Sequence, residues 1–263
     1  MKQNTKIQNL RSVIQSYGKV AVCLSGGVDS CTLLKFSSEI LGSDNVLAIV
    51  GSAEYMIVEE MDFAKKLCEK LGVRLVSIDV SVAEIISANP PERCYICKRK
   101  IFSTAKKIAE SFGIYKVVDG TNYDDLNEVR LGMLAKKEFC IESPFADCKI
   151  SKNLIRELAK SLSLEECSRK VSATCLMTRF PVGAKASRED FVAIEKVEAF
   201  VKSLGFDLVR ARVCGDTIII EVECSRVSEL TSHKNMAILK DYFVKEIKKD
   251  FKISEQGYKL GFV

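Results

Sequence analysis

The chain has 263 residues, of which 47% are apolar and 29% charged, and its net charge is +5. This balance is typical of a soluble globular protein with one large domain or two modest ones. The mild basic excess permits an anionic substrate, whereas nucleic-acid binding favours a concentrated basic patch, so we do not expect a nucleic-acid partner.

The first residues lack the pattern of a signal peptide, and no apolar run approaches the roughly 18 residues of a membrane span. We therefore expect a cytoplasmic protein without a membrane partner. The eleven cysteines are an odd number in a chain without a secretion signal, which speaks against a disulfide framework.

Hydrophobic periodicity predicts strands that alternate with helices in the first part of the chain. Strands are expected at residues 20–24, 45–50, 74–80 and 116–119. Helices are expected from about Cys31 and over residues 58–71, 98–112, 127–135 and 150–161, the last with Ser151 as its cap. This alternation predicts an α/β fold, in which helices wrap both faces of a parallel sheet and ligands bind at the carboxyl ends of the strands.

The pattern changes after Gly183, where we place a domain boundary between residues 1–183 and 184–263. Ser187 and Asp190 resemble a capping box at the start of a helix that ends at Leu204. Two strands, a helix and a last strand follow, at residues 207–213, 217–223, 228–249 and 258–263. We expect a smaller α+β domain that binds substrate or mediates oligomerisation. The apolar face of the 187–204 helix suits an interface, so a homo-oligomer is expected.

The run Ser25-Gly26-Gly27-Val28-Asp29-Ser30 lies between the first predicted strand and the helix that follows it. Gly26 and Gly27 permit main-chain conformations that are closed to other residues. Backbone N–H groups and the positive end of the helix dipole then face a phosphate group. The hydroxyls of Ser25 and Ser30 add donors, and Asp29 suits a Mg²⁺ ion. The order of strand, loop and helix favours a pyrophosphate-binding loop over a plain tight turn, although no Walker A motif occurs.

Cys94 and Cys97 form a Cys-x-x-Cys, whose thiolates can chelate one metal ion or two irons of one cluster. A redox pair and a chance pair remain alternatives. A zinc site would need further ligands, and the chain has no second Cys-x-x-Cys and only one histidine, His233. Cys175 lies among polar and chain-breaking residues, which favours an exposed loop over a buried linker. Arg179 nearby would favour a thiolate at Cys175 or contact an anion.

Arg210 and Arg212 alternate along one predicted strand, so their side chains point the same way. Two neighbouring guanidinium groups suit a phosphate, but alternation alone fits a solvated strand face equally well. Glu221 and Glu223 on the next strand are possible partners for these arginines.

The motif SGGVDS at residues 25–30 resembles the signature of the PP-loop ATP pyrophosphatases. The resemblance implies a HUP-like fold and cleavage of ATP between its α and β phosphates, with adenylation of a substrate oxygen. NAD and GMP synthetases, tRNA thiolases and the LarE sulfur transferases belong to this superfamily. The resemblance to this superfamily also implies that Gly120 and Thr121, within the run 119–122, lie near the nucleotide. It places Ser52, within the run 51–53, near adenine.

Several segments in this order resemble the LarE family, at residues 25–30, 93–98, 119–122, 130–132, 143–144 and 174–181. The resemblance implies a sulfurtransferase that splits ATP to AMP and pyrophosphate. It implies adenylation of a carboxylate of pyridinium-3,5-biscarboxylic acid mononucleotide and its conversion to a thiocarboxylate, in the biosynthesis of a nickel-pincer cofactor. Within this family, Arg210 and Arg212 match an Arg-x-Arg pair thought to bind the substrate's phosphate. We expect Arg179 to contact the same phosphate.

The LarE family has two sulfur sources. Some members sacrifice the sulfur of one cysteine, at the position of Cys175, and others bind a [4Fe-4S] cluster through three cysteines. This sequence has all three, Cys94, Cys97 and Cys175, so we favour the cluster, with ATP and Mg²⁺ as the other cofactors. The alternatives are sacrifice of Cys175, a cluster-dependent tRNA thiolase, a nucleotide sensor with a structural metal, and an amidating synthetase.

Overall fold

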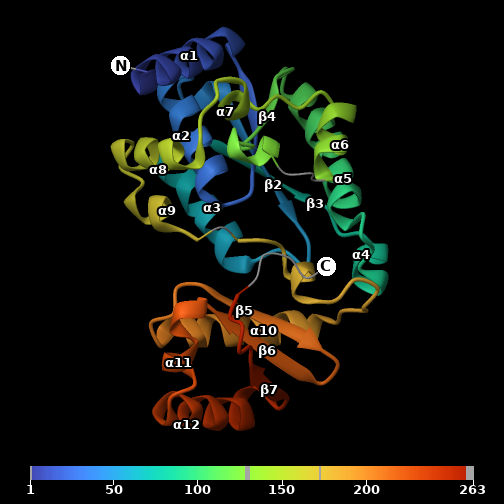
Figure 1. The fold of residues 1–263 in the computed structure, drawn as a ribbon. Helices are drawn as coiled ribbons and strands as arrows, with labels where there is room; N and C mark the ends of the chain where they lie inside the picture. The colour runs from blue at the N-terminus through green and yellow to red at the C-terminus, as the bar shows by residue number, and fades with distance from the viewer. Residues whose placement is uncertain (1, 128–130, 172, 259–263) are drawn as a thin grey trace. The chain divides into compact units, whose positions relative to one another are not determined.

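A computed structural model of the chain describes residues 2–127, 131–171 and 173–258, and it divides into two compact units (Figure 1). The first unit consists of Met1–Val82 and Glu92–Ala173, and the second of Ala83–Pro91 and Thr174–Val263. None of the described helices is long and apolar enough to cross a membrane.

The second unit includes a short segment from the middle of the sequence because that segment bonds to the chain around Gly183. The Asn89 side chain donates to the carbonyl groups of Phe180 at 3.1 Å and Pro181 at 2.9 Å. The Gly183 amide donates to the Asn89 carbonyl at 3.2 Å. This division falls at Thr174 and therefore differs from the boundary expected at Gly183. The roles assigned to the two domains stay predictions.

The first unit contains a four-stranded sheet whose strands pair in parallel. Its order is β3 (Arg74–Asp79), β2 (Val46–Ser52), β1 (Val20–Leu24) and β4 (Val117–Asp119). Cys23 of β1 stands opposite Ile49 on one side and Asp119 on the other, so three strands end at the same edge. This confirms the predicted parallel α/β architecture, which fits a HUP-like fold.

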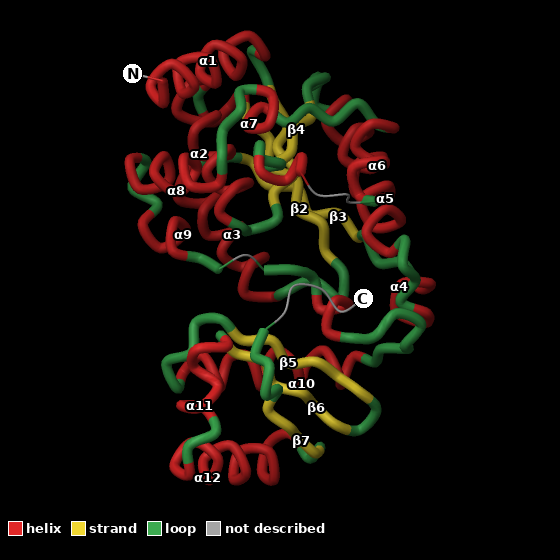
Figure 2. The backbone as a smooth tube through the Cα atoms, viewed as in Figure 1, coloured by secondary structure: helices red, strands yellow, loops and turns green. Residues whose placement is uncertain are grey.

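Helices lie on both sides of this sheet, with α2, α3 and α8 to one side and α5 and α6 to the other (Figures 1 and 2). They are α1 (Lys2–Tyr17), α2 (Val28–Leu41), α3 (Val58–Leu71), α5 (Arg93–Ser111), α6 (Gly132–Glu138), α7 (Pro144–Asp147), α8 (Lys152–Ser161) and α9 (Glu165–Arg169), with 3-10 turns η1 (Ser43–Asn45) and η2 (Asp124–Asn127). The core lies between α2 and the strands, where Leu33, Phe36 and Val22 are almost fully buried. Ser151 caps α8, as predicted, by accepting from the Leu154 amide at 3.4 Å.

Several elements of this unit differ from the prediction. Helix α1 was not predicted, although it buries Leu10 and Ile14 in the core. The short helices α7 and α9 were not predicted either. Helix α5 begins at Arg93, before the expected start at Lys98. The helix expected over 127–135 is replaced by η2 and α6, and residues 128–130, which include Arg130 of the 130–132 motif, lie outside the described part of the chain.

The second unit has a three-stranded sheet in the order β5 (Val209–Cys214), β6 (Thr217–Val222) and β7 (Asp250–Ile253). Strands β5 and β6 are antiparallel, and β6 and β7 are parallel. The remaining elements are α4 (Ala83–Ala88), η3 (Leu176–Arg179), α10 (Arg188–Ser203), η4 (Cys224–Arg226), α11 (Val227–Leu230), α12 (His233–Tyr242) and η5 (Phe243–Ile247).

Helix α10 begins at the predicted capping box, in which Ser187 and Asp190 bond each other reciprocally. Its apolar face, with Phe191, Ile194 and Val197, is buried inside the unit and packs on β5 rather than facing outward as an interface. An oligomer therefore stays a prediction without this support.

One prediction for the end of the chain is wrong. The expected helix over 228–249 is two α-helices, because Ser232 caps α12 and Lys248 ends the following π turn with a left-handed φ of +58°. Strand β7 at Asp250–Ile253 was not predicted. The strand expected at 258–263 falls almost wholly on residues 259–263, which lie outside the described part of the chain, and stays a prediction.

Candidate functional site

The phosphate loop, residues 25–27, joins the end of β1 to the first residue of α2, Val28. Gly26 has a φ of +84°, and a Cβ atom there would lie 2.1 Å from the Glu60 carbonyl oxygen, so only glycine fits. Gly27, by contrast, is the N-cap of α2 with a φ of −74°, and a Cβ there would meet nothing closer than 3.6 Å. The predicted need for special backbone freedom therefore holds for Gly26 and is wrong for Gly27.

Two serine hydroxyls bridge the loop. Ser30 is buried, and its hydroxyl accepts from the Ser25 amide at 3.1 Å and donates to the Gly27 carbonyl at 3.3 Å. The Ser25 hydroxyl is 3.0 Å from that of Ser30, while Ser25 itself is exposed. Ser30 therefore closes the loop, and Ser25 faces the solvent side where a ligand would arrive.

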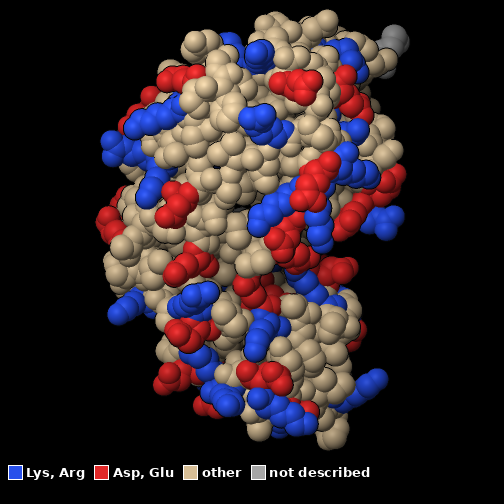
Figure 3. All heavy atoms as spheres, turned by 180° about the vertical axis from the view of Figure 1, so that it is seen from behind, with Lys and Arg blue, Asp and Glu red and all other residues tan. Residues whose placement is uncertain are grey.

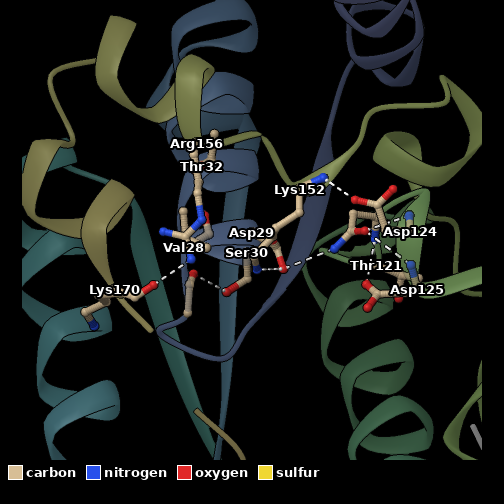
Figure 4. Close-up of polar contacts among 12 residues, drawn as sticks. Val28, Asp29, Ser30, Thr32, Thr121, Asp124, Asp125, Lys152, Arg156 and Lys170 are labelled. Atoms are coloured by element: carbon tan, nitrogen blue, oxygen red, sulfur yellow. Dashed lines mark hydrogen bonds and ion pairs between the residues drawn. The ribbon is translucent and has the colours of Figure 1, made fainter. Parts of the chain in front are cut away.

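Asp29, in the first turn of α2, lies between this helix and the turn after β4 (Figure 4). Its Oδ2 atom accepts from the Lys152 ammonium at 2.6 Å and from the Asn122 amide at 3.5 Å. Its Oδ1 atom is buried and has no hydrogen-bond partner among the described residues. Burial raises the pKa of this carboxyl, against the lowering effect of Lys152. A half-satisfied carboxylate beside a phosphate loop fits a hard cation such as Mg²⁺, which prefers oxygen ligands.

Gly120 and Thr121 follow β4, which pairs with β1, so they lie beside the phosphate loop. A Cβ atom on Gly120 would lie 2.7 Å from the Ser30 amide nitrogen, so the glycine permits a close approach of two backbones. Thr121 turns back onto Asp119, with its hydroxyl 2.7 Å from Oδ2 and its amide 3.2 Å from Oδ1. The structure thus brings together two motifs that are about ninety residues apart in the sequence.

Ser52 is the last residue of β2, the other neighbour of β1, so it also lies at the carboxyl edge of the sheet. Its carbonyl accepts from the Val80 amide at 2.9 Å and its side chain is half-buried. The contact with adenine expected here stays a prediction.

Sequence reasoning missed the lysines that support this edge. Lys152 holds Asp29 from α8, and Lys136 of α6 bonds the Ser143 hydroxyl, which in turn bonds Asp119. Lys136 also lies 3.7 Å from the Asp119 carboxylate. No local motif marks these lysines, because each meets its partner only through the tertiary fold.

Cys94 and Cys97 lie in the first turn of α5, three residues apart, so both side chains emerge from the same face of the helix. Cys94 is exposed and Cys97 is half-buried. The hydroxyl of the buried Tyr55 lies 3.9 Å from the Cys97 sulfur and 3.0 Å from the Val80 carbonyl oxygen. Two thiols on one helical turn, at least one of them open to solvent, suit joint coordination of a metal or cluster.

Cys175 belongs to the second unit, immediately before the turn η3. It is half-buried, whereas Leu176 and Met177 beside it are buried, so the expected exposed loop is exposed only in part. Within the described residues, no group of three or more histidine, cysteine or acidic side chains is arranged to hold a metal ion. Cys94 and Cys97 belong to one unit and Cys175 to the other, so a shared cluster stays a prediction.

Arg179 is a buried side chain that holds the backbone at Thr174 and Cys175 in place. Its guanidinium is 1% exposed and forms a two-pronged ion pair with Glu198, at 2.8 and 3.1 Å. The remaining nitrogen donates to the carbonyl of Thr174 at 2.9 Å and that of Cys175 at 3.4 Å. These contacts make Arg179 a positioning group for Cys175, a role that differs from the anion contact expected from the sequence.

Arg210 and Arg212 lie on β5, with Glu221 of β6 opposite Arg210. Arg212 pairs with Glu221 at 2.8 Å and donates to the Thr178 carbonyl at 2.9 Å, which confirms one of the pairings considered. Arg210 is buried under the ring of Tyr258, at 5.4 Å, and burial together with the charge of Arg179 lowers its pKa.

Three buried guanidinium groups therefore share this unit with two buried carboxylates. The cluster, made of Arg179, Arg210, Arg212, Glu198 and Glu221, carries one excess positive charge. An anion is the partner that such an excess favours.

Comparison with known proteins gives the family. The sequence model of NAD synthase matches residues 3–106, which hold the phosphate loop and the strands β1 to β3. An uncharacterised protein of Methanocaldococcus jannaschii is 36% identical over 87% of this chain and 88% of its own length. The pyridinium-3,5-bisthiocarboxylic acid mononucleotide synthase of Lactiplantibacillus plantarum is 32% identical over 86% of this chain and 82% of its own length.

Glutamine-dependent NAD(+) synthetase of Xylella fastidiosa is also similar, at 38% identity, but over only 24% of this chain. The similarity to amidating enzymes is thus confined to a segment, whereas the similarity to the Lactiplantibacillus synthase extends over both units. The chain belongs to the LarE family of PP-loop enzymes.

Proposed function

We propose that this protein is an ATP-dependent sulfurtransferase that converts a carboxylate of pyridinium-3,5-biscarboxylic acid mononucleotide to a thiocarboxylate. The observation that supports the use of ATP is the meeting of Gly26, Asp29 and Gly120 at one sheet edge, where a buried carboxylate oxygen has no hydrogen-bond partner among the described residues. The proposed substrate is supported by the name of the Lactiplantibacillus relative, a protein whose similarity extends over most of this chain.

The first step joins the substrate to AMP. A carboxylate oxygen attacks the α-phosphorus of ATP, the bond to the β-phosphate oxygen breaks, and pyrophosphate leaves. The phosphate loop supplies backbone donors and the N-terminus of α2 for the developing negative charge. Asp29, with Lys152 at 2.6 Å, would hold the Mg²⁺ that neutralises the leaving pyrophosphate.

The second step replaces oxygen by sulfur. A sulfur nucleophile adds to the acyl carbon of the adenylated substrate. AMP leaves with the carboxylate oxygen that joined it to that carbon, and the thiocarboxylate remains. The buried arginine cluster of the second unit, with its excess positive charge, would hold the phosphate of the substrate mononucleotide through Arg210 and Arg212.

We assign the sulfur to a [4Fe-4S] cluster held by Cys94, Cys97 and Cys175. The donor set fits, because the first two thiols emerge from one helical turn and the third lies on an anchored, partly exposed segment. Held by these three thiolates, the cluster would supply the sulfide that is transferred.

The test is anaerobic purification followed by metal analysis and turnover with the pyridinium substrate. We expect roughly four irons per chain and release of AMP and pyrophosphate. Cys94→Ala, Cys97→Ala and Cys175→Ala should each lose iron, whereas Cys140→Ala, which removes another exposed thiol, should keep it.

Two results separate the alternatives. Iron-free protein that transfers one sulfur per chain, with dehydroalanine at Cys175 by mass spectrometry, would replace the cluster by a sacrificial cysteine. A failure to release AMP with any carboxylate substrate would remove the sulfurtransferase proposal altogether. Charges of both signs are interspersed on the face shown in Figure 3, so this face presents no dense basic patch for tRNA. Steeply salt-dependent tRNA binding would favour the tRNA thiolase instead.

A further inference from the structure

Lys170 lies behind the phosphate loop and outside the motifs that the sequence reveals. Its ammonium donates to the Gly26 carbonyl at 3.1 Å and to Glu60 Oε1 at 2.9 Å, and it lies 3.7 Å from the centre of the Phe63 ring. The Lys170 and Glu60 side chains are only 14% and 15% exposed. Solvent and salt therefore screen this pair much less than a surface pair.

The backbone of Lys170 is fixed from another helix. Arg156 of α8 donates to the Lys170 carbonyl at 2.8 Å and to the carbonyl of Ser168 (Figure 4). Lys170 follows directly after α9, so these bonds hold the end of that helix in place. The ammonium is thus delivered to the loop by a braced segment rather than by a mobile surface chain.

Glu60 makes such a cation necessary. The Glu60 carbonyl packs against Gly26, and Glu60 Oε2 lies 3.9 Å from the place that a Cβ on Gly27 would take. A carboxylate so close to the loop would repel the phosphates of ATP if it carried an unpaired charge. Lys170 supplies the opposite charge at 2.9 Å.

The bond to the Gly26 carbonyl acts on the same loop from a second direction. In a planar trans peptide, the carbonyl of Gly26 and the N–H of Gly27 point in opposite directions. A cation that holds the carbonyl on one side therefore orients the N–H toward the other. The charge also polarises the peptide, which makes that N–H a stronger donor.

We propose that Lys170, together with Glu60, is a positioning residue for the phosphates of ATP: it fixes the Gly26–Gly27 peptide and cancels the carboxylate charge beside it. This inference rests on the proposed ATP-dependent function. It adds a determinant of nucleotide binding from α3 and from the residue that follows α9, outside the phosphate loop itself.

The test compares four variants by steady-state AMP formation. Lys170→Met should raise the KM for ATP about tenfold, with a smaller change in kcat, because a charge-assisted bond and a charge balance are lost. Lys170→Arg should retain most of the affinity. Adding Glu60→Gln to Lys170→Met should restore part of it, since the negative charge beside the phosphate loop is then removed. Lys66→Met, at an exposed lysine of the same helix as Glu60, is the control.

An unchanged KM in Lys170→Met would overturn the inference. The inference would also be overturned if Lys170→Met lost affinity for ATP together with a lowered melting temperature, and Glu60→Gln did not restore that affinity. Lys170 would then have a structural role only. Equilibrium binding of Mg·ATP to each variant gives a readout independent of turnover. Wild-type protein that binds Mg·ATP but releases no AMP would refute the proposed function and leave this inference standing on the binding data.

Discussion

Asp29, the proposed Mg²⁺ ligand, lies in surroundings that oppose its ionisation. Its carboxylate is largely buried beside the phosphate loop, with one oxygen on Lys152 and the other without a described partner. Burial raises its pKa, so the fold disfavours the ionised form that a metal ligand needs. Sites that bind charged ligands commonly give up stability in this way.

Replacing Asp29 by Asn should therefore stabilise the metal-free protein. Because the folded-state pKa lies above the unfolded value of about 3.9, the penalty is absent below the unfolded pKa and is present in full above the folded one. We expect the melting temperature at pH 7, without Mg²⁺, to rise by about 2 °C, and this gain to shrink toward pH 4. AMP formation should be lost.

Differential scanning calorimetry across this pH range checks the prediction, with the exposed Asp44→Asn as a control that should not change the midpoint. A lower melting temperature for Asp29→Asn at pH 7 would show that the ion pair with Lys152 outweighs the effect of burial.

Helix starts are the elements that local sequence determines best. Ser187 accepts from the Asp190 amide at 3.1 Å, and Asp190 accepts from the Ser187 amide at 3.2 Å, as the sequence predicts. Lys249, at 2.8 Å from Asp190, adds a partner that the sequence did not reveal. This box fixes the first turn of α10, whose buried face covers β5.

Ser187→Ala should destabilise the protein by about 1 kcal/mol, the usual cost of removing a helix N-cap. Ser203→Ala, at the other end of α10, removes an exposed hydroxyl that donates to the Phe200 carbonyl at 2.6 Å, so we expect a change within about 0.5 kcal/mol. Urea unfolding measures both. Equal effects would mean that the box contributes nothing beyond an ordinary surface hydroxyl.

At the scale of the whole molecule, the two units carry separate sheets and separate functional groups. The phosphate loop, Asp29 and Gly120 belong to the first unit, and the buried arginine cluster belongs to the second. Nucleotide binding should therefore act mainly on the first unit.

Hydrogen exchange with and without Mg·ATP should reveal this. We expect added protection in peptides that contain residues 24–30 and 119–122, and little change in β5 and β6, because a ligand protects the backbone it orders. Gly26→Ala, which would place a Cβ 2.1 Å from the Glu60 carbonyl oxygen, should abolish the protection. Protection confined to β5 and β6 would place the nucleotide elsewhere.

Local patterns determined the strands β1 to β6, the longer helices α2, α3, α5, α8 and α10, and both predicted caps, because each depends on periodicity or on residues a few positions apart. They failed at α1, whose charged and polar surface masks a narrow buried stripe, and at the short elements α4, α7, α9 and β7, which were not predicted.

The amino-acid sequence by itself determined the parallel α/β class, and it predicts the site residues Gly26, Asp29, Gly120 and the three cysteines. Only the tertiary structure decided which groups surround them. Lys152 and Lys170 meet partners that are more than a hundred residues away in the sequence. Arg179 pairs with Glu198 and bonds the backbone beside Cys175. The physical reason is that ion pairs and hydrogen bonds depend on distance in space, which periodicity along the chain does not encode.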